Sequence, residues 1–393
     1  MTKTVQPIRL TSADVYRGFV MFLMMAEVLQ FEHVSEALPD STFWQFLTYH
    51  QSHVEWIGCS LHDLIQPSFS FLVGLVLPYS LTNRLMQSSS QTQIWLHTLW
   101  RSFILVGLGI FLRSQHAQQT YFTFEDTLTQ IGLGYPILFL LGCSTQRTQL
   151  STLVVILIGY WATFVLYVPT LPQEVAQTGV ANDWPHHLQG FTAHWEKNYN
   201  LAWAFDRWFL NLFPRKNPFL FNRGGYATLS FIPTLGTMLL GLLAGNILKS
   251  TQSINSKLIT FLICGFGGIG LGMLISSLGI CPNVKRIWTP SWVLFSGGWC
   301  FLLLTFFYLV VDIFQQKRAF FMLKVIGMNS IAAYVIAETM VGYIGKALTI
   351  HLGQHYATIF GDAYQSLVRG SLILLLEWLI LYWLYKRNIF IKV

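Results

Sequence analysis

Apolar stretches of membrane-spanning length, separated by short polar connectors, recur along almost the whole chain. A helix needs about 20 predominantly apolar residues to cross the roughly 30 Å hydrocarbon core of a bilayer. By that criterion the pattern predicts ten spans, at about 13–30, 61–82, 94–113, 127–142, 151–169, 229–248, 257–279, 291–314, 320–343 and 368–386. We therefore expect an all-α, polytopic transmembrane helical bundle that forms a single domain over residues 1–393.

The charges in the connectors predict how this bundle is oriented. The connectors on the N-terminal side carry nine Lys or Arg residues and no acidic residue; they are 1–12, 83–93, 143–150, 249–256, 315–319 and 387–393. The first connector on the opposite side, 31–60, carries four acidic residues and no Lys or Arg. Because cytoplasmic loops are enriched in Lys and Arg, both termini are expected in the cytoplasm.

The one long connector, about 170–228, is then external. It is rich in aromatic residues, amides and histidines, including Trp184, His186, His187, Trp195, Trp203 and Trp208. Aromatic faces with scattered amides suit carbohydrate binding. Amphipathic helices lying in the membrane interface are an equally good interpretation of the same pattern.

Composition narrows the class of protein further. Charged residues make up 10% of the chain and apolar residues 53%, whereas soluble domains carry about 25% charged residues. The net charge of +7 lies mostly in the connectors, and no basic stripe with interleaved aromatic residues appears. These observations exclude a soluble enzyme, a disordered chain and a nucleic-acid-binding protein. The partner they predict is the lipid bilayer.

A dense group of chemically active side chains stands just before the second span. His53 lies close in sequence to Glu55, His62 and Asp63, so it is a candidate general base at the outer membrane boundary. Ser60-x-x-Asp63 matches a capping box, which predicts a structural role for Asp63 at the start of a helix.

The same region offers little for a metal ion. His50 and His53 are three residues apart, but no further ligand of the metal-site type stands nearby. The five cysteines are widely spaced and include no C-x-x-C pair. We therefore expect neither a metal site nor a disulfide framework.

Two carboxylates are predicted at the depth of His53. Glu27 lies near the outer end of the first span, and Glu338 reaches a similar depth on the ninth. Ionisable residues within spans are candidates for function because burying a charge in lipid is costly. Together with His53 they would form the mouth of an outer active site.

Four further polar residues lie elsewhere in the predicted spans. Asp14 and Arg17 are three residues apart on the first helix and are expected to pair with each other. Arg101 in the third span needs an anionic partner, either a phosphate-bearing cofactor or Glu377 of the last span. Asn329 in the ninth span can hydrogen-bond between helices or bind a ligand, and the sequence favours neither.

Ordered motifs along most of the chain carry a resemblance to a known family. They are Asp14-Val15-Tyr16-Arg17-Gly18, His53-x-x-Trp56-x-Gly58 with Asp63-Leu64, Trp100-Arg101-Ser102-Phe103, Gln130-Ile131-Gly132, Leu235-Gly236-Thr237, Lys285-Arg286-Ile287-Trp288-Thr289-Pro290-Ser291, Tyr308-Leu309-Val310-Val311-Asp312 and Gly327-Met328-Asn329-Ser330. In these motifs and their order the chain resembles the heparan-α-glucosaminide N-acetyltransferase family of transmembrane acetyltransferases.

The resemblance implies a membrane-embedded helical bundle that forms a homodimer and uses acetyl-CoA. Such an enzyme takes the donor from the cytoplasmic side and acetylates a terminal glucosamine amine on the other side. The catalytic histidine of the family falls on His53. Where the family has an asparagine near the outer end of the first helix, this chain has Glu27.

A mechanism of this kind gives hypothetical roles to the other polar residues. Glu27 would orient His53 or hold the hydroxyls of the acceptor, and Asn329 would donate to the developing oxyanion. The remaining candidates are Arg84, Arg101 and Lys249 for the nucleotide end of acetyl-CoA, and Trp56, Asp63 and Glu338 for the acceptor. Direct transfer and an acetyl-histidine intermediate are both open.

A second interpretation is a permease for a sugar or an organic anion, since buried ionisable groups and kinked helices suit it too. Against it, the chain has no obvious internal repeat of the kind common in secondary transporters. A membrane scaffold is a third interpretation, but it gives Glu27, Arg101 and Glu338 no role.

For the acetyltransferase interpretation, the expected acceptor is a small molecule or a glycan, and the expected location is a bacterial inner membrane.

Overall fold

The computed structural model describes residues 10–86, 90–170 and 174–391, and from position 83 to 86 it describes only the backbone. Within these ranges the chain is all-helical, and its one extended pairing is the isolated bridge between Ile57 and Val284. The all-α fold class is therefore confirmed.

Within the described residues, seven helical segments are long and apolar enough to cross a membrane. They are His62–Thr82, Gln91–Arg113, Gln146–Leu166, Thr228–Lys249, Ile254–Ser277, Pro290–Ile313 and Asp362–Lys386. The pair Phe321–Met328 and Ser330–Thr339 adds an eighth if it is one span bent by 85°. These helices support an integral membrane protein.

The expected number of ten spans is not confirmed. The first predicted span is the 15-residue helix α1, Thr11–Met25, which continues as the short 3₁₀-helix η1, Ala26–Leu29. The fourth is the 16-residue helix α6, Thr127–Gly142. Both are shorter than the roughly 20 residues of a full span. The count of ten and the cytoplasmic termini stay predictions.

Contacts divide the described chain into two compact units. The central unit consists of Glu55–Gly58 and the described part of Gln66–Thr305, and the terminal unit consists of Leu10–Val54, Cys59–Ile65 and the described residues from Phe306 onward. The names refer only to positions along the sequence. The single-domain interpretation stays a prediction.

The central unit is built from long apolar helices that approach each other at glycines. They are α4 (Ile65–Met86), α5 (Gln91–Arg113), α6, α7 (Gln146–Leu166), α10 (Phe231–Lys249), α11 (Ile254–Ser277) and α12 (Pro290–Phe307). A Cβ atom built on Gly241 of α10 would lie 1.9 Å from the carbonyl oxygen of Phe71 in α4. Only glycine permits this backbone contact, as is common between helices in membranes.

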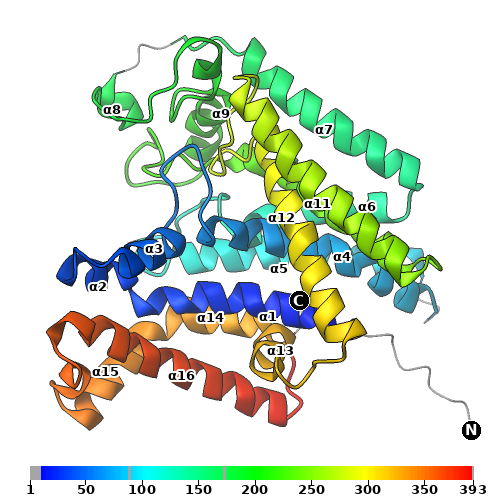
Figure 1. The fold of residues 1–393 in the computed structure, drawn as a ribbon. Helices are drawn as coiled ribbons and strands as arrows, with labels where there is room; N and C mark the ends of the chain where they lie inside the picture. The colour runs from blue at the N-terminus through cyan, green and yellow to red at the C-terminus, as the bar shows by residue number, and fades with distance from the viewer. Residues whose placement is uncertain (1–9, 87–89, 171–173, 392–393) are drawn as a thin grey trace, which may run out of the picture. The chain divides into compact units, whose positions relative to one another are not determined.

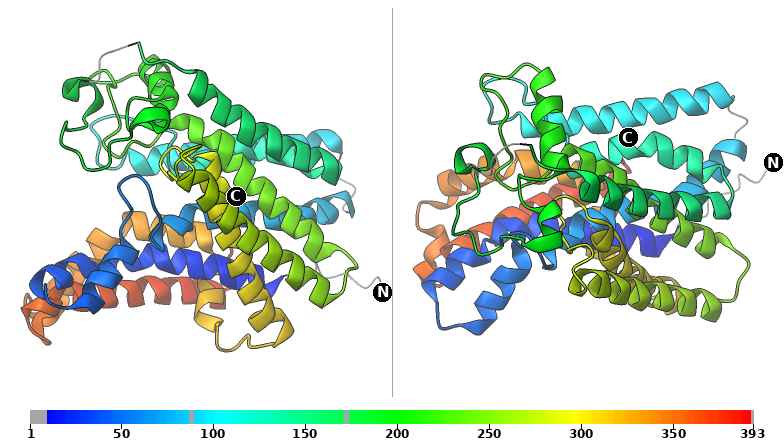
Figure 2. Two further views of the ribbon diagram at one scale, coloured as in Figure 1. Left: turned by 45° about the horizontal axis from the view of Figure 1, so that its top comes forward. Right: turned by 90° about the horizontal axis from the view of Figure 1, so that it is seen from above.

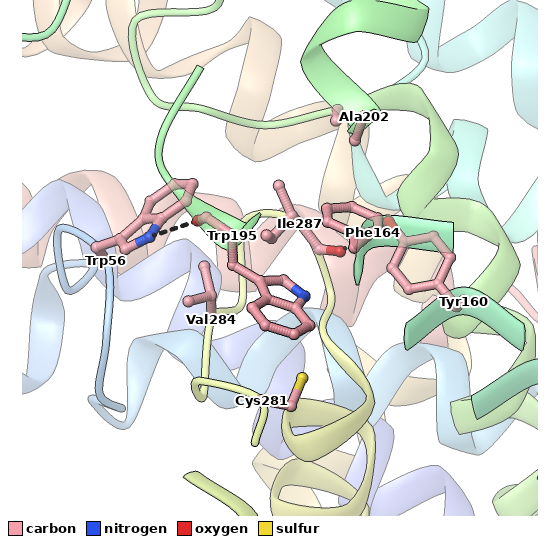
Figure 3. Packing of buried hydrophobic residues seen from close by; sticks show 9 residues of the cluster. Trp56, Tyr160, Phe164, Trp195, Ala202, Cys281, Val284 and Ile287 are labelled. Carbon is pink, nitrogen blue, oxygen red and sulfur yellow. Dashed lines mark hydrogen bonds between the residues drawn. The ribbon is translucent and has the colours of Figure 1, made fainter. Parts of the chain in front are cut away.

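In the central unit, the described part of the long connector at about 170–228 is folded around buried aromatic side chains. It contains α8 (Val175–Thr178), η3 (Gly190–Trp195), α9 (Leu201–Phe209), η4 (Leu210–Leu212) and η5 (Thr228–Ser230). Figure 3 shows its core, which comprises Trp56, Tyr160, Phe164, Trp195, Ala202, Ala227, Cys281, Val284 and Ile287. The indole of Trp56 donates to the carbonyl oxygen of Trp195 at 3.2 Å. Several predicted aromatic residues thus serve as packed core, whereas Trp208 is exposed.

The terminal unit combines the first and the last helices that the structure describes. Its helices are α1, η1, α2 (Phe31–Ala37), α3 (Thr42–Gln51), η2 (His62–Leu64), the π-helix η6 (Tyr308–Ile313), α13 (Phe321–Met328), α14 (Ser330–Thr339), α15 (Val341–Leu352), η7 (Tyr356–Thr358), η8 (Asp362–Tyr364) and α16 (Gln365–Lys386). Helix α1 packs along α13 and α14, and α16 packs against α13, α14 and η1 (Figure 1, with further views in Figure 2).

Reciprocal glycines bring α1 and α13 into backbone contact. A Cβ on Gly18 would lie 1.8 Å from the carbonyl oxygen of Leu323, and one on Gly327 would lie 1.9 Å from that of Asp14. The predicted pair on α1 is confirmed, with Arg17 Nη1 3.9 Å from Asp14 Oδ1. These contacts anchor the helix whose continuation, η1, carries Glu27.

Candidate functional site

The site is built where α3 returns to the end of η1. Gln30 has a φ of 47°, in the left-handed region, and it turns the chain from η1 into α2. The side chain of Gln51, the last residue of α3, donates to the carbonyl oxygen of Ala26 at 2.7 Å and accepts from the backbone N–H of Phe31 at 2.8 Å. One amide thus fixes η1, α2 and α3 around the position of His53.

The carboxylate of Asp63 holds the imidazole of His53. Its Oδ1 atom lies 2.8 Å from His53 Nδ1, and its Oδ2 atom accepts from the backbone N–H groups of Val54 and Ser60 at 3.2 and 3.0 Å. The Asp63 side chain is fully buried, whereas 37% of the His53 side chain is exposed. A buried carboxylate fixed by backbone donors is well suited to orient an imidazole.

The predicted capping box is confirmed in the same hydrogen bonds. Ser60 Oγ accepts from the backbone N–H of Asp63 at 3.2 Å, while the Asp63 carboxylate accepts from the backbone N–H of Ser60. This reciprocal pattern satisfies donors at the start of the helix. Asp63 therefore has a structural role and contacts His53 at the same time.

A second carboxylate–imidazole pair lies beside the first. His62 Nε2 is 2.6 Å from Glu27 Oε1, and the ring centroids of His62 and His53 are 4.6 Å apart. The His62 side chain is 6% exposed and that of Glu27 is 56% exposed. The expected orienting role of Glu27 toward His53 is thus filled by Asp63, because η1 directs Glu27 to His62.

These groups open into one pocket of about 350 Å³. Its lining residues are Glu27, Gln30, Glu32, His33, Thr48, Gln51, Ser52, His53 and His62, all of them in the terminal unit. The lining residues include two carboxylates, Glu27 and Glu32, but no Lys or Arg. The pocket therefore has the chemistry to receive a small polar molecule with a positive charge, next to two imidazoles.

Glu55 and Trp56, which follow His53 closely in the sequence, lie in the central unit. The Glu55 carboxylate accepts from the Trp184 indole at 2.8 Å, and this hydrogen bond lowers the pKa of Glu55. Trp56, a predicted acceptor-binding residue, is fully buried in the aromatic core of the central unit. Adjacent positions in one motif thus serve two different units.

The candidates on the ninth predicted span lie apart from the pocket lining. Asn329 occupies the break between α13 and α14, where its side chain donates to Ile389 O at 2.9 Å and accepts from Ile391 N at 3.0 Å. Glu338 is exposed on α14.

Glu377, on the tenth predicted span, is fully buried on α16, and neither of its carboxylate oxygens has a hydrogen-bond partner among the described residues.

The candidate anion contacts lie in the central unit. Arg101 Nη1 donates to the Tyr135 hydroxyl at 3.0 Å, but the buried Nε–H of Arg101 has no partner among the described residues. Lys249 Nζ donates to Pro78 O at 3.2 Å and to Thr82 Oγ1. Arg84 lies near the end of α4, and its side chain is outside the described part of the structure. The unsatisfied donor of Arg101 is the feature that fits an anion.

Sequence reasoning missed one partner in the site. His62 stands in the His53 motif, but nothing in the spacing indicates that it contacts Glu27.

The structure also contains, within its described residues, no cluster of three or more His, Cys, Asp or Glu side chains arranged for a metal ion.

The chain is similar to the heparan-α-glucosaminide N-acetyltransferase of Homo sapiens, with 24% identity over 98% of its length. The Mus musculus enzyme of the same name is 23% identical, again over 98% of the chain. The chain spans about 60% of the length of these curated relatives. No protein-family model matches it. The predicted resemblance is thus confirmed as a relationship at the family level.

Proposed function

Given this relationship with the heparan-α-glucosaminide N-acetyltransferases, we propose that the chain is a transmembrane acetyltransferase. It transfers the acetyl group of acetyl-CoA to an amine, of the kind carried by an amino sugar, on the opposite side of the membrane. The observation that carries the proposal is the imidazole of His53, held at Nδ1 by the buried carboxylate of Asp63 at the wall of an acidic pocket.

The geometry supports His53 as the general base. With Nδ1–H donated to Asp63, Nε2 is the nitrogen that exchanges a proton with the acceptor. The amine nitrogen attacks the thioester carbonyl, His53 Nε2 takes a proton from that nitrogen, and the carbon–sulfur bond breaks. The CoA thiolate then takes the proton from His53. An acetyl-histidine intermediate needs the same ring orientation and remains the alternative route.

The donor is a substrate with several phosphate charges, which need cationic contacts at the cytoplasmic mouth. Arg101 is the best-supported contact, because its Nε–H is buried without a partner among the described residues. A buried donor that makes no hydrogen bond costs free energy, which a bound phosphate would recover. Lys249 and Arg84 are further candidates. Asn329, Trp56 and Glu338 keep their expected roles only as predictions, as does the homodimer.

The test is acetyl transfer from labelled acetyl-CoA to glucosamine by the purified full chain. We expect His53→Gln to lower the rate by about 10²–10⁴-fold, the usual contribution of general acid–base catalysis. His50→Gln is the matched control, because His50 contacts the backbone N–H of Leu61 and does not line the pocket. An unchanged rate in His53→Gln would contradict the proposal.

A CoA-binding measurement separates this function from a permease. A ligand at 100 times its Kd stabilises the folded state by about 2.7 kcal/mol. We expect CoA to raise the melting temperature of the wild type, and Arg101→Gln to weaken that shift. A permease for sugars has no reason to respond to CoA.

A further inference from the structure

We propose that the Glu27–His62 pair is a second proton acceptor of this site. It takes the proton that converts an ammonium acceptor into the nucleophilic amine before His53 acts. The inference rests on the proposed acetyl transfer and extends it, because it assigns a role to His62 and specifies a cationic acceptor.

The chemistry requires two protons to leave the acceptor nitrogen. An aliphatic amine near neutral pH is present largely as the ammonium ion, which has no lone pair for attack. One proton must leave to give the amine, and another must leave when the amide forms. His53 holds one proton at a time, so a second acceptor nearby allows both steps in one binding event.

The contacts of the pair suit the first step. His62 Nε2 and Glu27 Oε1 lie 2.6 Å apart, a distance at which an imidazole and a carboxylate share a proton. A pair that holds this one proton carries a single negative charge. The 56% exposed carboxylate of Glu27 lines the pocket, while the 6% exposed imidazole of His62 is its buried partner. Transfer of one proton from the ammonium leaves a neutral amine and a neutral pair. The pair later releases that proton to water at the open pocket.

The position of the pair suits the second step. The His62 ring lies 4.6 Å from the His53 ring, so an amine formed beside Glu27 is already next to the general base. Within the terminal unit, the other titratable groups near the pair are Glu32, His33, His50 and Asp63. Helix α16, which packs against η1, also carries Arg369 and Glu377. Glu32 adds a second negative charge at the pocket, which favours a cationic acceptor over a neutral or anionic one.

The test is the pH profile of kcat/KM for acetyl transfer to glucosamine by the purified full chain. In His62→Gln we expect a loss of about 10²-fold at acidic to neutral pH, within the range for one acid–base group. The loss should shrink to a few-fold at alkaline pH, because the acceptor then arrives as the amine. Glu27→Gln, which breaks the pair from its exposed side, should show the same pH-selective loss.

Two comparisons make the result decisive. His53→Gln should lose activity at every pH, and His50→Gln should change the rate by the same small factor throughout. A loss in both His62→Gln and Glu27→Gln that is equal at all pH values, or no loss in either, would overturn the inference while leaving the transferase intact. Absence of transfer by the wild type would instead refute the proposed function and the inference with it.

Discussion

Asp63 caps the start of a helix and also contacts His53, and the local spacing in the sequence indicates only the cap. The Ser60-x-x-Asp63 spacing predicts a cap, and the cap is present. The contact with His53 depends on how the chain between α3 and η2 folds back, which no local spacing encodes. Glu27 and His62 are even further apart in the sequence, so only the packed structure identifies them as a pair.

At the residue scale, Asp63→Asn is expected to lower acetyl transfer by about 10²–10⁴-fold. The asparagine amide donates a hydrogen bond and would favour the wrong tautomer of His53. Ser60→Ala is the matched control, because it removes a capping side chain that contacts Asp63 Oδ2 but leaves the Asp63 Oδ1 contact with His53 in place. Both variants should lose about 1 kcal/mol of stability, but only Asp63→Asn should lose activity. Equal activity losses would show that Asp63 acts only as a cap.

At the scale of elements, the apolar pattern places the helices well but not their breaks. The predicted span at 320–343 is divided into α13 and α14, which are bent by 85° at Asn329. The side chain of Asn329 supports this break by bonding to the backbone of Ile389 and Ile391. A hydrophobic run contains no information about such a distant backbone partner.

The close approach of α1 and α13 gives a prediction about stability. In Gly327→Ala the new Cβ would meet the carbonyl oxygen of Asp14, so the helices must separate, at a cost of about 1–3 kcal/mol. Gly342→Ala in α15 is the matched control, since no atom lies within 4 Å of its added Cβ. Thermal unfolding in detergent measures both. A Gly327→Ala variant as stable as Gly342→Ala would refute this account of the helix contact.

At the scale of the whole molecule, the proposed reaction joins two aqueous compartments. With the chain reconstituted in vesicles, acetyl-CoA trapped on the cytoplasmic face should label glucosamine supplied on the other face. Vesicles with His53→Gln are the control for leakage of either substrate. If label appears only when both substrates share one compartment, the enzyme does not transfer acetyl groups across the membrane.

The sequence by itself determined the helical, membrane-embedded class, the family-level similarity and the cap at Asp63, and it made His53 a candidate for the chemistry. Each of these depends on composition, periodicity or short spacing, which act locally along the chain. Only the tertiary structure decided that Asp63 rather than Glu27 holds His53, that Glu27 pairs with His62, and that Trp56 is core. Those outcomes depend on contacts between distant segments, and such contacts exist only after the helices have packed.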